Sequence, residues 1–148
     1  MKGGKLSKFS LLNAKASTLN ELSDFYMRCG YGGDFSPNDE VFYAKDGNQF
    51  IAVVRLALEE GIYILRGMQV LPCLRGNKIG VQLLSYMMEN LPAQGRTLFC
   101  LPHSHLTAFY ERAGFIIAEP KAVPDFLLIR RANYAKKGLN IELMVCSS

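Results

Sequence analysis

The sequence of 148 residues contains no tryptophan, two histidines and four cysteines. The cysteines stand far apart, at Cys29, Cys73, Cys100 and Cys146, without a CxxC pair or the Cys/His spacing of a zinc finger. This pattern fits neither a structural metal site nor a disulfide framework. We therefore predict reduced thiols and no metal centre.

Long hydrophobic runs are missing as well. No apolar segment approaches the ~20 residues that cross a bilayer, and Met1 is not followed by the apolar stretch and cleavage site of a secretion signal. These absences predict a cytoplasmic protein with no membrane partner. The net charge is also small, because 17 lysines and arginines against 13 acidic residues give +4. That charge favours an anionic ligand but does not by itself indicate nucleic acid.

Apolar residues are plentiful, at 49% of the sequence, and this is enough for one buried core in a chain of 148 residues. No repeat, low-complexity tract or linker divides the chain. We predict a single domain over residues 1–148. A monomer and a homodimer are both compatible with this composition.

Alternating apolar segments fill the first half of the chain. Strands are predicted over 8–14, 41–45, 50–58 and 62–70. The capping-box pattern from Thr18 to Glu21 predicts a helix that ends near Gly30, and the glycine-rich segment 31–39 predicts a surface loop. Asp46-Gly47-Asn48 is typical of a hairpin turn. The strands over 41–45, 50–58 and 62–70 together predict a three-stranded antiparallel meander.

The second half alternates between helical and extended patterns. Apolar residues from Ile79 to Leu91 recur every three or four positions until Pro92. Helices are predicted over 79–91, 104–113 and 125–137, and strands over 97–101, 115–118 and 140–146. The segment 126–130 is also compatible with a strand. An exposed helix face is predicted to carry Arg130, Arg131, Lys136 and Lys137. The fold class is therefore mixed α/β, with strand-helix-strand units in its second half.

The junction before the helix 79–91 carries the sequence RGNKIG, from Arg75 to Gly80. The first turn of a helix has N–H groups without intrahelical partners and a partial positive charge, so it suits a phosphate. Gly76 and Gly80 would let an anion approach the main chain, while Arg75 and Lys78 add charge. The spacing lacks the P-loop and dinucleotide patterns. The glycines are equally compatible with a turn and a close helix contact.

Two motifs carry a resemblance to a known family. The segment from Val70 to Leu84 resembles the coenzyme A loop of the GNAT acyltransferase superfamily, [Q/R]xxGx[G/A] after a strand ending in VxP. The segment AFYERAGF, at 108–115, is similar to a second GNAT motif with Tyr-Glu before Gly-Phe. The segments 31–33 and 65–70 resemble small N-acetylglutamate synthase-like acetyltransferases. The resemblance implies a single GNAT-like acyl-CoA N-acyltransferase domain, in which the meander leads into strand-helix-strand units around a splayed central strand pair.

The same resemblance implies acetyl-CoA as the cofactor. Its pantetheine and diphosphate would be held by Met68, Gln69, Val70, Arg75, Gly76, Asn77, Lys78, Ile79, Gly80 and Val81. A main-chain N–H of the splayed strand would stabilise the oxyanion, and Tyr110 would donate a proton to the leaving sulfur. The chain departs from the family at Lys78, where glycine is expected, and at His103, where many relatives carry asparagine. A packed aromatic is the competing interpretation of Tyr110.

The residues on the acceptor side are less specific. Candidates for the general base are His103, His105, Glu60 and Asp34, and His103 is nearest to the expected reaction centre. Tyr31, Asp34 and Arg66 are candidates for contacts with the acceptor. Arg66 could receive a carboxylate through two hydrogen bonds, or point to solvent from the other face of its strand.

The resemblance implies an N-acetyltransferase that moves an acetyl group from acetyl-CoA to a primary amine of a small metabolite or peptide. The amine would attack directly in a ternary complex. One alternative is a coenzyme A-binding regulatory module of weak activity, which Lys78 and the missing asparagine support. The other is a basic RNA- or ribosome-associated protein, favoured only by the charge, since no recognised RNA motif is present. Nucleic acid is therefore not expected as a partner.

Overall fold

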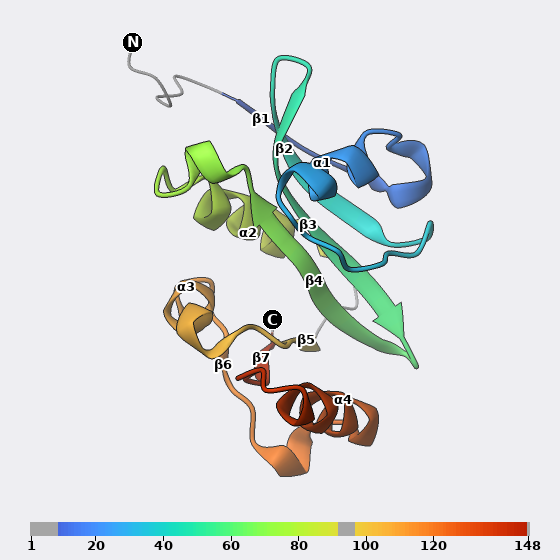
Figure 1. Cartoon of the computed structure of the whole chain (residues 1–148), viewed down its shortest axis with the longest axis vertical. Coiled ribbons are helices and arrows are strands. Elements are labelled where there is room, and N and C mark those ends of the chain that lie inside the picture. Colours follow the sequence, from blue (N-terminus) through green and yellow to red (C-terminus); the bar gives the residue numbers. More distant parts are fainter. Residues whose placement is uncertain (1–8, 92–96, 148) are drawn as a thin grey trace.

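The computed structural model describes residues 9–91 and 97–147. A seven-stranded mixed sheet in the order β1-β2-β3-β4-β5-β7-β6 forms its centre (Figure 1). The strands are β1 (Ser10–Lys15), β2 (Glu40–Asp46), β3 (Gln49–Glu59), β4 (Ile62–Val70), β5 (Thr97–Cys100), β6 (Ile116–Ile117) and β7 (Met144–Ser147). The helices are α1 (Leu22–Arg28), α2 (Ile79–Glu89), α3 (Thr107–Glu111) and α4 (Asp125–Lys136). The predicted α/β fold class is confirmed.

Strands β2, β3 and β4 form the predicted antiparallel meander, and β1 also pairs antiparallel with β2. Asp46 pairs with Gln49, so Gly47 and Asn48 make the two-residue turn of the β2–β3 hairpin. The next pairing changes direction, because β5 runs parallel to β4 after the crossover through α2. Within the described part of the chain, no helix has the length and apolar character that a membrane span needs.

One detail of the prediction is wrong. Thr18 does not cap a helix: it ends a short 3-10 turn (Ala16–Thr18), where its hydroxyl donates to the Lys15 carbonyl at 2.8 Å, and α1 begins only at Leu22. The helix predicted over 125–137 is confirmed as α4, which buries Leu127, and the alternative strand over 126–130 is absent. The predicted helix stop at Pro92 lies outside the described residues.

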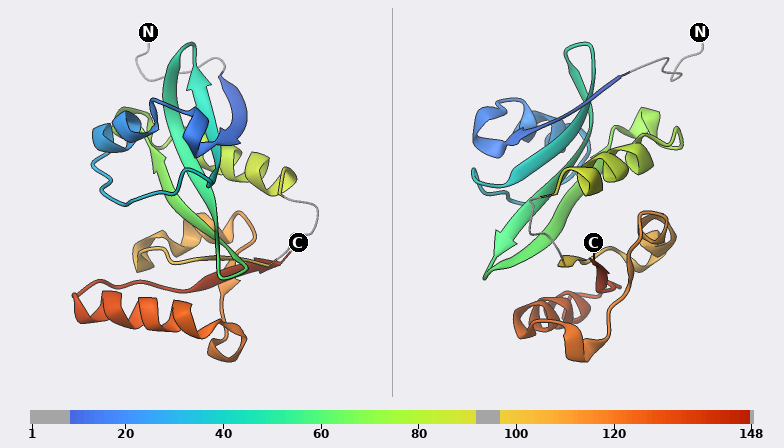
Figure 2. Two further views of the ribbon diagram at one scale, coloured as in Figure 1. Left: turned by 90° about the vertical axis from the view of Figure 1, so that its right-hand side faces the viewer. Right: turned by 180° about the vertical axis from the view of Figure 1, so that it is seen from behind.

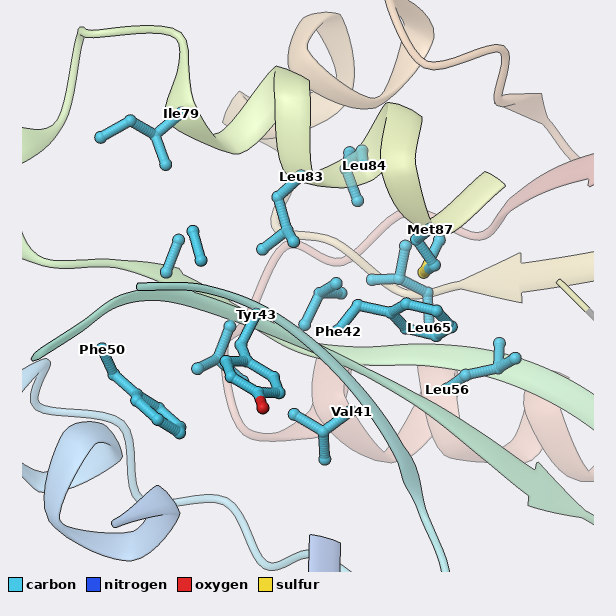
Figure 3. Packing of buried hydrophobic residues seen from close by; sticks show 14 of the residues in the cluster. Val41, Phe42, Tyr43, Phe50, Leu56, Leu65, Ile79, Leu83, Leu84 and Met87 are labelled. Atoms are coloured by element: carbon cyan, nitrogen blue, oxygen red, sulfur yellow. The ribbon is translucent and has the colours of Figure 1, made fainter. Parts of the chain in front are cut away.

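Both faces of the sheet are covered, as the continuous burial of β3 requires. Figure 2 shows α1 and α2 on opposite sides of the strands β2 to β4, with α4 along the C-terminal half. Leu83 and Met87 point from α2 toward Phe42, whereas Tyr43 and Phe50 point to the other side (Figure 3). A second apolar cluster lies under α4 and contains Ile64, Phe99, Ala118, Val123, Leu127 and Leu143. This packing holds α2 and α4 on either side of β4.

A bulge interrupts β4 where it faces β3. Arg55 pairs with Arg66 and Val53 with Gln69, so β4 has one residue more than β3 over this stretch. Gly67 lies within it at φ +63°. A Cβ there would come within 2.4 Å of the Tyr26 hydroxyl. The bulge therefore requires glycine.

Gly67→Ala is expected to lower the free energy of unfolding by about 3 kcal/mol, because left-handed strain adds to displacement of buried side chains. Gly47→Ala is the matched control, since Gly47 has the same φ of +63° but open space around it. That variant should lose only about 1 kcal/mol in urea unfolding. Equal losses in the two variants would show that the close contact at Gly67 costs nothing.

Candidate active site

The site begins where β4 separates from β5. The two strands pair only from Tyr63 to Leu65 on β4, opposite residues 98–100 of β5. Beyond Leu65, β4 continues past its bulge to Val70 while the chain after β5 turns toward α3 (Figure 1). The main chain of residues 66–70 is thus not paired with β5. The predicted splayed strand pair is present.

The larger of two neighbouring cavities, about 610 Å³, lies between the end of β4, the start of α2 and α3. Residues 68–70 and 78–81 both line it. Its charged lining residues are all basic, namely Arg75, Lys78 and Arg112, with His105 beside them. A cavity with this lining suits an elongated ligand that carries several negative charges.

Side chains in the turn before α2 hold its main chain in place through hydrogen bonds. Arg75 donates from Nε to the Val70 carbonyl at 3.0 Å, which ties the turn to the end of β4. Asn77 donates from Nδ2 to the Leu74 carbonyl at 3.1 Å. Gly76 has φ +90°. The first-turn N–H groups of α2, at residues 79–81, have no acceptor one turn earlier in the helix and lie at the cavity.

Lys78, the departure from the family pattern, is left-handed at φ +64° and ψ 11°. A lysine in this conformation is strained by about 1–2 kcal/mol. Lys78→Gly is therefore expected to raise the free energy of unfolding by about 1 kcal/mol, after allowance for glycine's greater unfolded-state entropy.

Lys78→Ala serves as the control in the same urea titration, because alanine loses the ammonium but keeps the strain. Only the glycine variant should be stabilised. If the two variants unfold at the same urea concentration, the backbone at Lys78 is not strained.

Gly80 has a packing role that the sequence left open. It is buried in the first turn of α2, and a Cβ on it would lie 3.1 Å from Phe109 and 3.2 Å from Met68. The close helix contact is therefore present at Gly80. The positive φ is at Gly76 instead.

The smaller cavity, about 280 Å³, lies on the other side of the splayed strands. Four segments supply its polar lining: β4 through Arg66, the segment after β5 through His103, α4 through Arg130 and Tyr134, and the loop after α1 through Tyr31. The two cavities share Met68, Gln69, Leu106 and Tyr110. A ligand in either cavity would therefore reach the same four residues.

Tyr110 lies on α3 at this junction and is only 6% exposed. Phe109 and Phe115 contact its ring nearly at right angles, with centroids 5.0 and 5.9 Å away. Burial, and then the neighbouring Cys100 and Tyr31, raise the pKa of Tyr110 well above its ordinary value. The phenol is therefore protonated at neutral pH.

The remaining candidates separate into different places. His103 lines the smaller cavity and His105 the larger one, and both are exposed. Asp34 is exposed and lines another hollow, which Arg66 also lines, and Glu60 lies in the turn between β3 and β4. Only His103 of the four proposed bases lines the same cavity as Arg66 and Tyr31.

A buried polar network that the sequence did not reveal supports this site. Arg55, 1% exposed, donates from Nη1 to Asp39 at 2.7 Å and from Nε to the Tyr26 hydroxyl at 3.1 Å. Its Nη2 donates to the Tyr31 hydroxyl at 3.2 Å. Tyr26 in turn donates to the Gly67 carbonyl at 2.8 Å. The network thus joins the wall residue Tyr31 to the bulge in β4.

The position of Arg130 differs from the prediction. Its guanidinium is not on an exposed face but contacts Glu59 through Nη2 at 2.6 Å and lines the smaller cavity. Lys136 and Lys137 are exposed as expected. Across residues 9–91 and 97–147, no three His, Cys, Asp or Glu side chains are grouped closely enough to hold a metal ion.

Comparison with known proteins decides the family. The model of the acetyltransferase (GNAT) domain matches residues 37–117, which is more than half of the chain. The chain belongs to the GNAT acetyltransferase family. The match covers the hairpin, the splayed strand β4, the turn before α2 and Tyr110. No curated protein sequence matches this GNAT chain significantly.

Solved structures resemble this GNAT chain in fold. N-acetylglutamate synthase from Neisseria gonorrhoeae, complexed with coenzyme A and N-acetyl-glutamate, has a TM-score of 0.71 at 16% identity over 97% of this chain. This chain spans only 36% of that enzyme's length. An acyl-CoA N-acyltransferase from Pseudomonas aeruginosa has a TM-score of 0.64 at 17% identity, covering 94% of this chain and 99% of its own.

A GNAT acetyltransferase from Elizabethkingia anophelis with acetyl-CoA bound has a TM-score of 0.60 at 14% identity, over 97% of this chain and all of its own. Identities this low show the shared fold alone. The predicted family and fold are confirmed by these matches together with the family model.

Proposed function

We propose that this GNAT protein transfers an acetyl group from acetyl-CoA to a primary amine of a small metabolite or peptide. The observation that carries the proposal is the meeting of two cavities at Tyr110 and Met68. One cavity is large and basic, the other is small and lies across the splayed strands. A donor and an acceptor could enter from opposite sides and meet at a buried proton donor.

Coenzyme A fits the larger cavity by its chemistry. The first-turn N–H groups of α2 and the basic side chains Arg75, Lys78 and Arg112 match a ligand with a diphosphate and a further phosphate. The main chain of residues 68–70, which is not paired with β5, can pair with the pantetheine amides as an additional strand would. Asn77 acts indirectly, since its side chain holds the turn through Leu74.

Bound acetyl-CoA would supply the thioester carbonyl that the acceptor amine attacks. A main-chain N–H of the splayed strand β4 would stabilise the oxyanion. Tyr110, kept protonated by burial, would give its proton to the departing sulfur. His103, at the acceptor cavity, would take the proton from the amine directly or through water.

Two measurements on the wild-type protein test this function. Calorimetric titration with coenzyme A should show binding, and free-thiol release from acetyl-CoA should rise when amines from a panel are added. Binding without thiol release from any amine would favour the regulatory module. Absence of both would contradict the proposed function.

A further inference from the structure

We propose that the acceptor carries a carboxylate as well as its amine, and that Arg130, with Arg66 beside it, binds this carboxylate in the smaller cavity. The inference rests on the proposed function for the role of the amine. It concerns a different part of the acceptor, so it can fail by itself.

The guanidinium of Arg130 has an unused donor. Its Nη2 donates to Glu59 Oε1 at 2.6 Å, but its Nη1 is buried and has no hydrogen-bond partner among the described residues. A buried donor of a charged group that makes no hydrogen bond is costly. Arg130 also lines the smaller cavity, so a shift of its guanidinium toward that cavity would let a ligand oxygen supply the missing acceptor.

The neighbouring charges leave the cavity positive. Both oxygens of Glu59 are used, Oε1 by Arg130 and Oε2 by Arg66 at 3.1 Å. Burial opposes ionisation of Glu59, but the hydrogen bond and charge of Arg130, with the charge of Arg66, outweigh it and lower its pKa. One carboxylate therefore faces two guanidinium groups. None of the described residues that line the cavity is acidic, so the remaining positive charge is available to a ligand.

The position and shape of the two arginines favour a carboxylate. The Arg130 guanidinium lies over the Phe126 ring, 5.6 Å from its centroid. A guanidinium carries paired donors that match the geometry of a planar carboxylate. Arg66 directly precedes the bulge at Gly67, and the same cavity reaches Tyr110. Its volume of about 280 Å³ suits an amino acid or a chain end of similar size.

The test compares each standard amino acid with its carboxamide, which has the same shape but no negative charge. We measure thiol release from acetyl-CoA with each compound. For at least one amino acid, kcat/KM is expected to be about tenfold or more above that of its amide. Arg130→Gln should remove this preference by lowering kcat/KM for the acid alone. Arg130→Lys should restore only part of it, since lysine keeps the charge but not the two-pronged donor.

Lys136→Gln is the control, because Lys136 lies on the same helix, is exposed and does not line the cavity. It should leave the preference for the acid intact. Thermal unfolding of each variant shows whether a loss of preference reflects loss of fold. A panel in which amides react as well as acids, or a preference that survives Arg130→Gln in folded protein, would overturn the inference.

A binding measurement keeps the inference testable if no amine on the panel reacts. N-acetyl amino acids and their amides are titrated calorimetrically, with and without coenzyme A. Binding of acids but not amides, lost in Arg130→Gln, supports the carboxylate site even when the proposed acetyl transfer has failed. Absence of any difference between acids and amides contradicts it, whether or not coenzyme A binds.

Discussion

Tyr110→Phe is expected to lower kcat for acetyl transfer by about 10²-fold or more, with little change in the affinity for coenzyme A. Phenylalanine fills the same space against Phe109 and Phe115, so only the hydroxyl is removed. Stopped-time assays of thiol release give kcat, and calorimetric titration gives the affinity. Tyr43→Phe is the control, because Tyr43 is also buried and its pKa is also raised by burial, but it lines neither cavity. It should keep full activity.

The pH profile gives the same prediction a second readout. A proton donor works only while it is protonated, so activity falls as the pH rises through its pKa. An ordinary tyrosine would impose that fall at about pH 10. Because burial raises the pKa of Tyr110, the wild-type rate should show no fall due to this group up to about pH 10. If the Tyr110→Phe variant reacts at the wild-type rate, Tyr110 is not the proton donor.

Asp39→Ala is expected to destabilise the protein by about 3–5 kcal/mol, because it leaves the buried guanidinium of Arg55 without its counter-charge. The two side chains are 7% and 1% exposed and contact at 2.7 Å. Urea unfolding measures the loss. Asn38→Ala, at the adjacent exposed residue, should cost less than about 1 kcal/mol.

A double variant separates the ion pair from general damage to the loop. Arg55→Met combined with Asp39→Ala removes both charges, and it should be more stable than Asp39→Ala alone because no unpaired charge stays buried. A double variant that is less stable than Asp39→Ala would contradict this explanation. Asp39→Ala should also disturb the smaller cavity, because Arg55 donates a hydrogen bond to Tyr31, which lines that cavity.

Local signals predicted much of the fold. The hairpin at Gly47 followed from its turn residues, and α2 followed from its helical spacing, because neighbours in sequence determine both. The capping box at Thr18 failed for a local reason too. A nearby carbonyl at Lys15 took the hydroxyl hydrogen bond instead, and a pattern of four residues cannot show which of two local partners is used.

The polar network escaped prediction because its partners are distant in sequence. Arg55 lies in an apolar strand, and nothing nearby indicates that Asp39 and Tyr26 meet it in the core. Arg130 was predicted on an exposed helix face, but its partner Glu59 is 71 positions away. The turn before α2 and Tyr110 were proposed as site residues because each belongs to a contiguous motif. The smaller cavity is assembled from separate segments, and only the folded chain brings them together.

A crystal structure with saturating coenzyme A tests the central claim most directly. The diphosphate is predicted to lie on the main-chain N–H groups of residues 76–81, and the sulfur within hydrogen-bonding distance of the Tyr110 hydroxyl. A diphosphate bound elsewhere, or a sulfur on the side of the strands away from Tyr110, would contradict the proposed transfer.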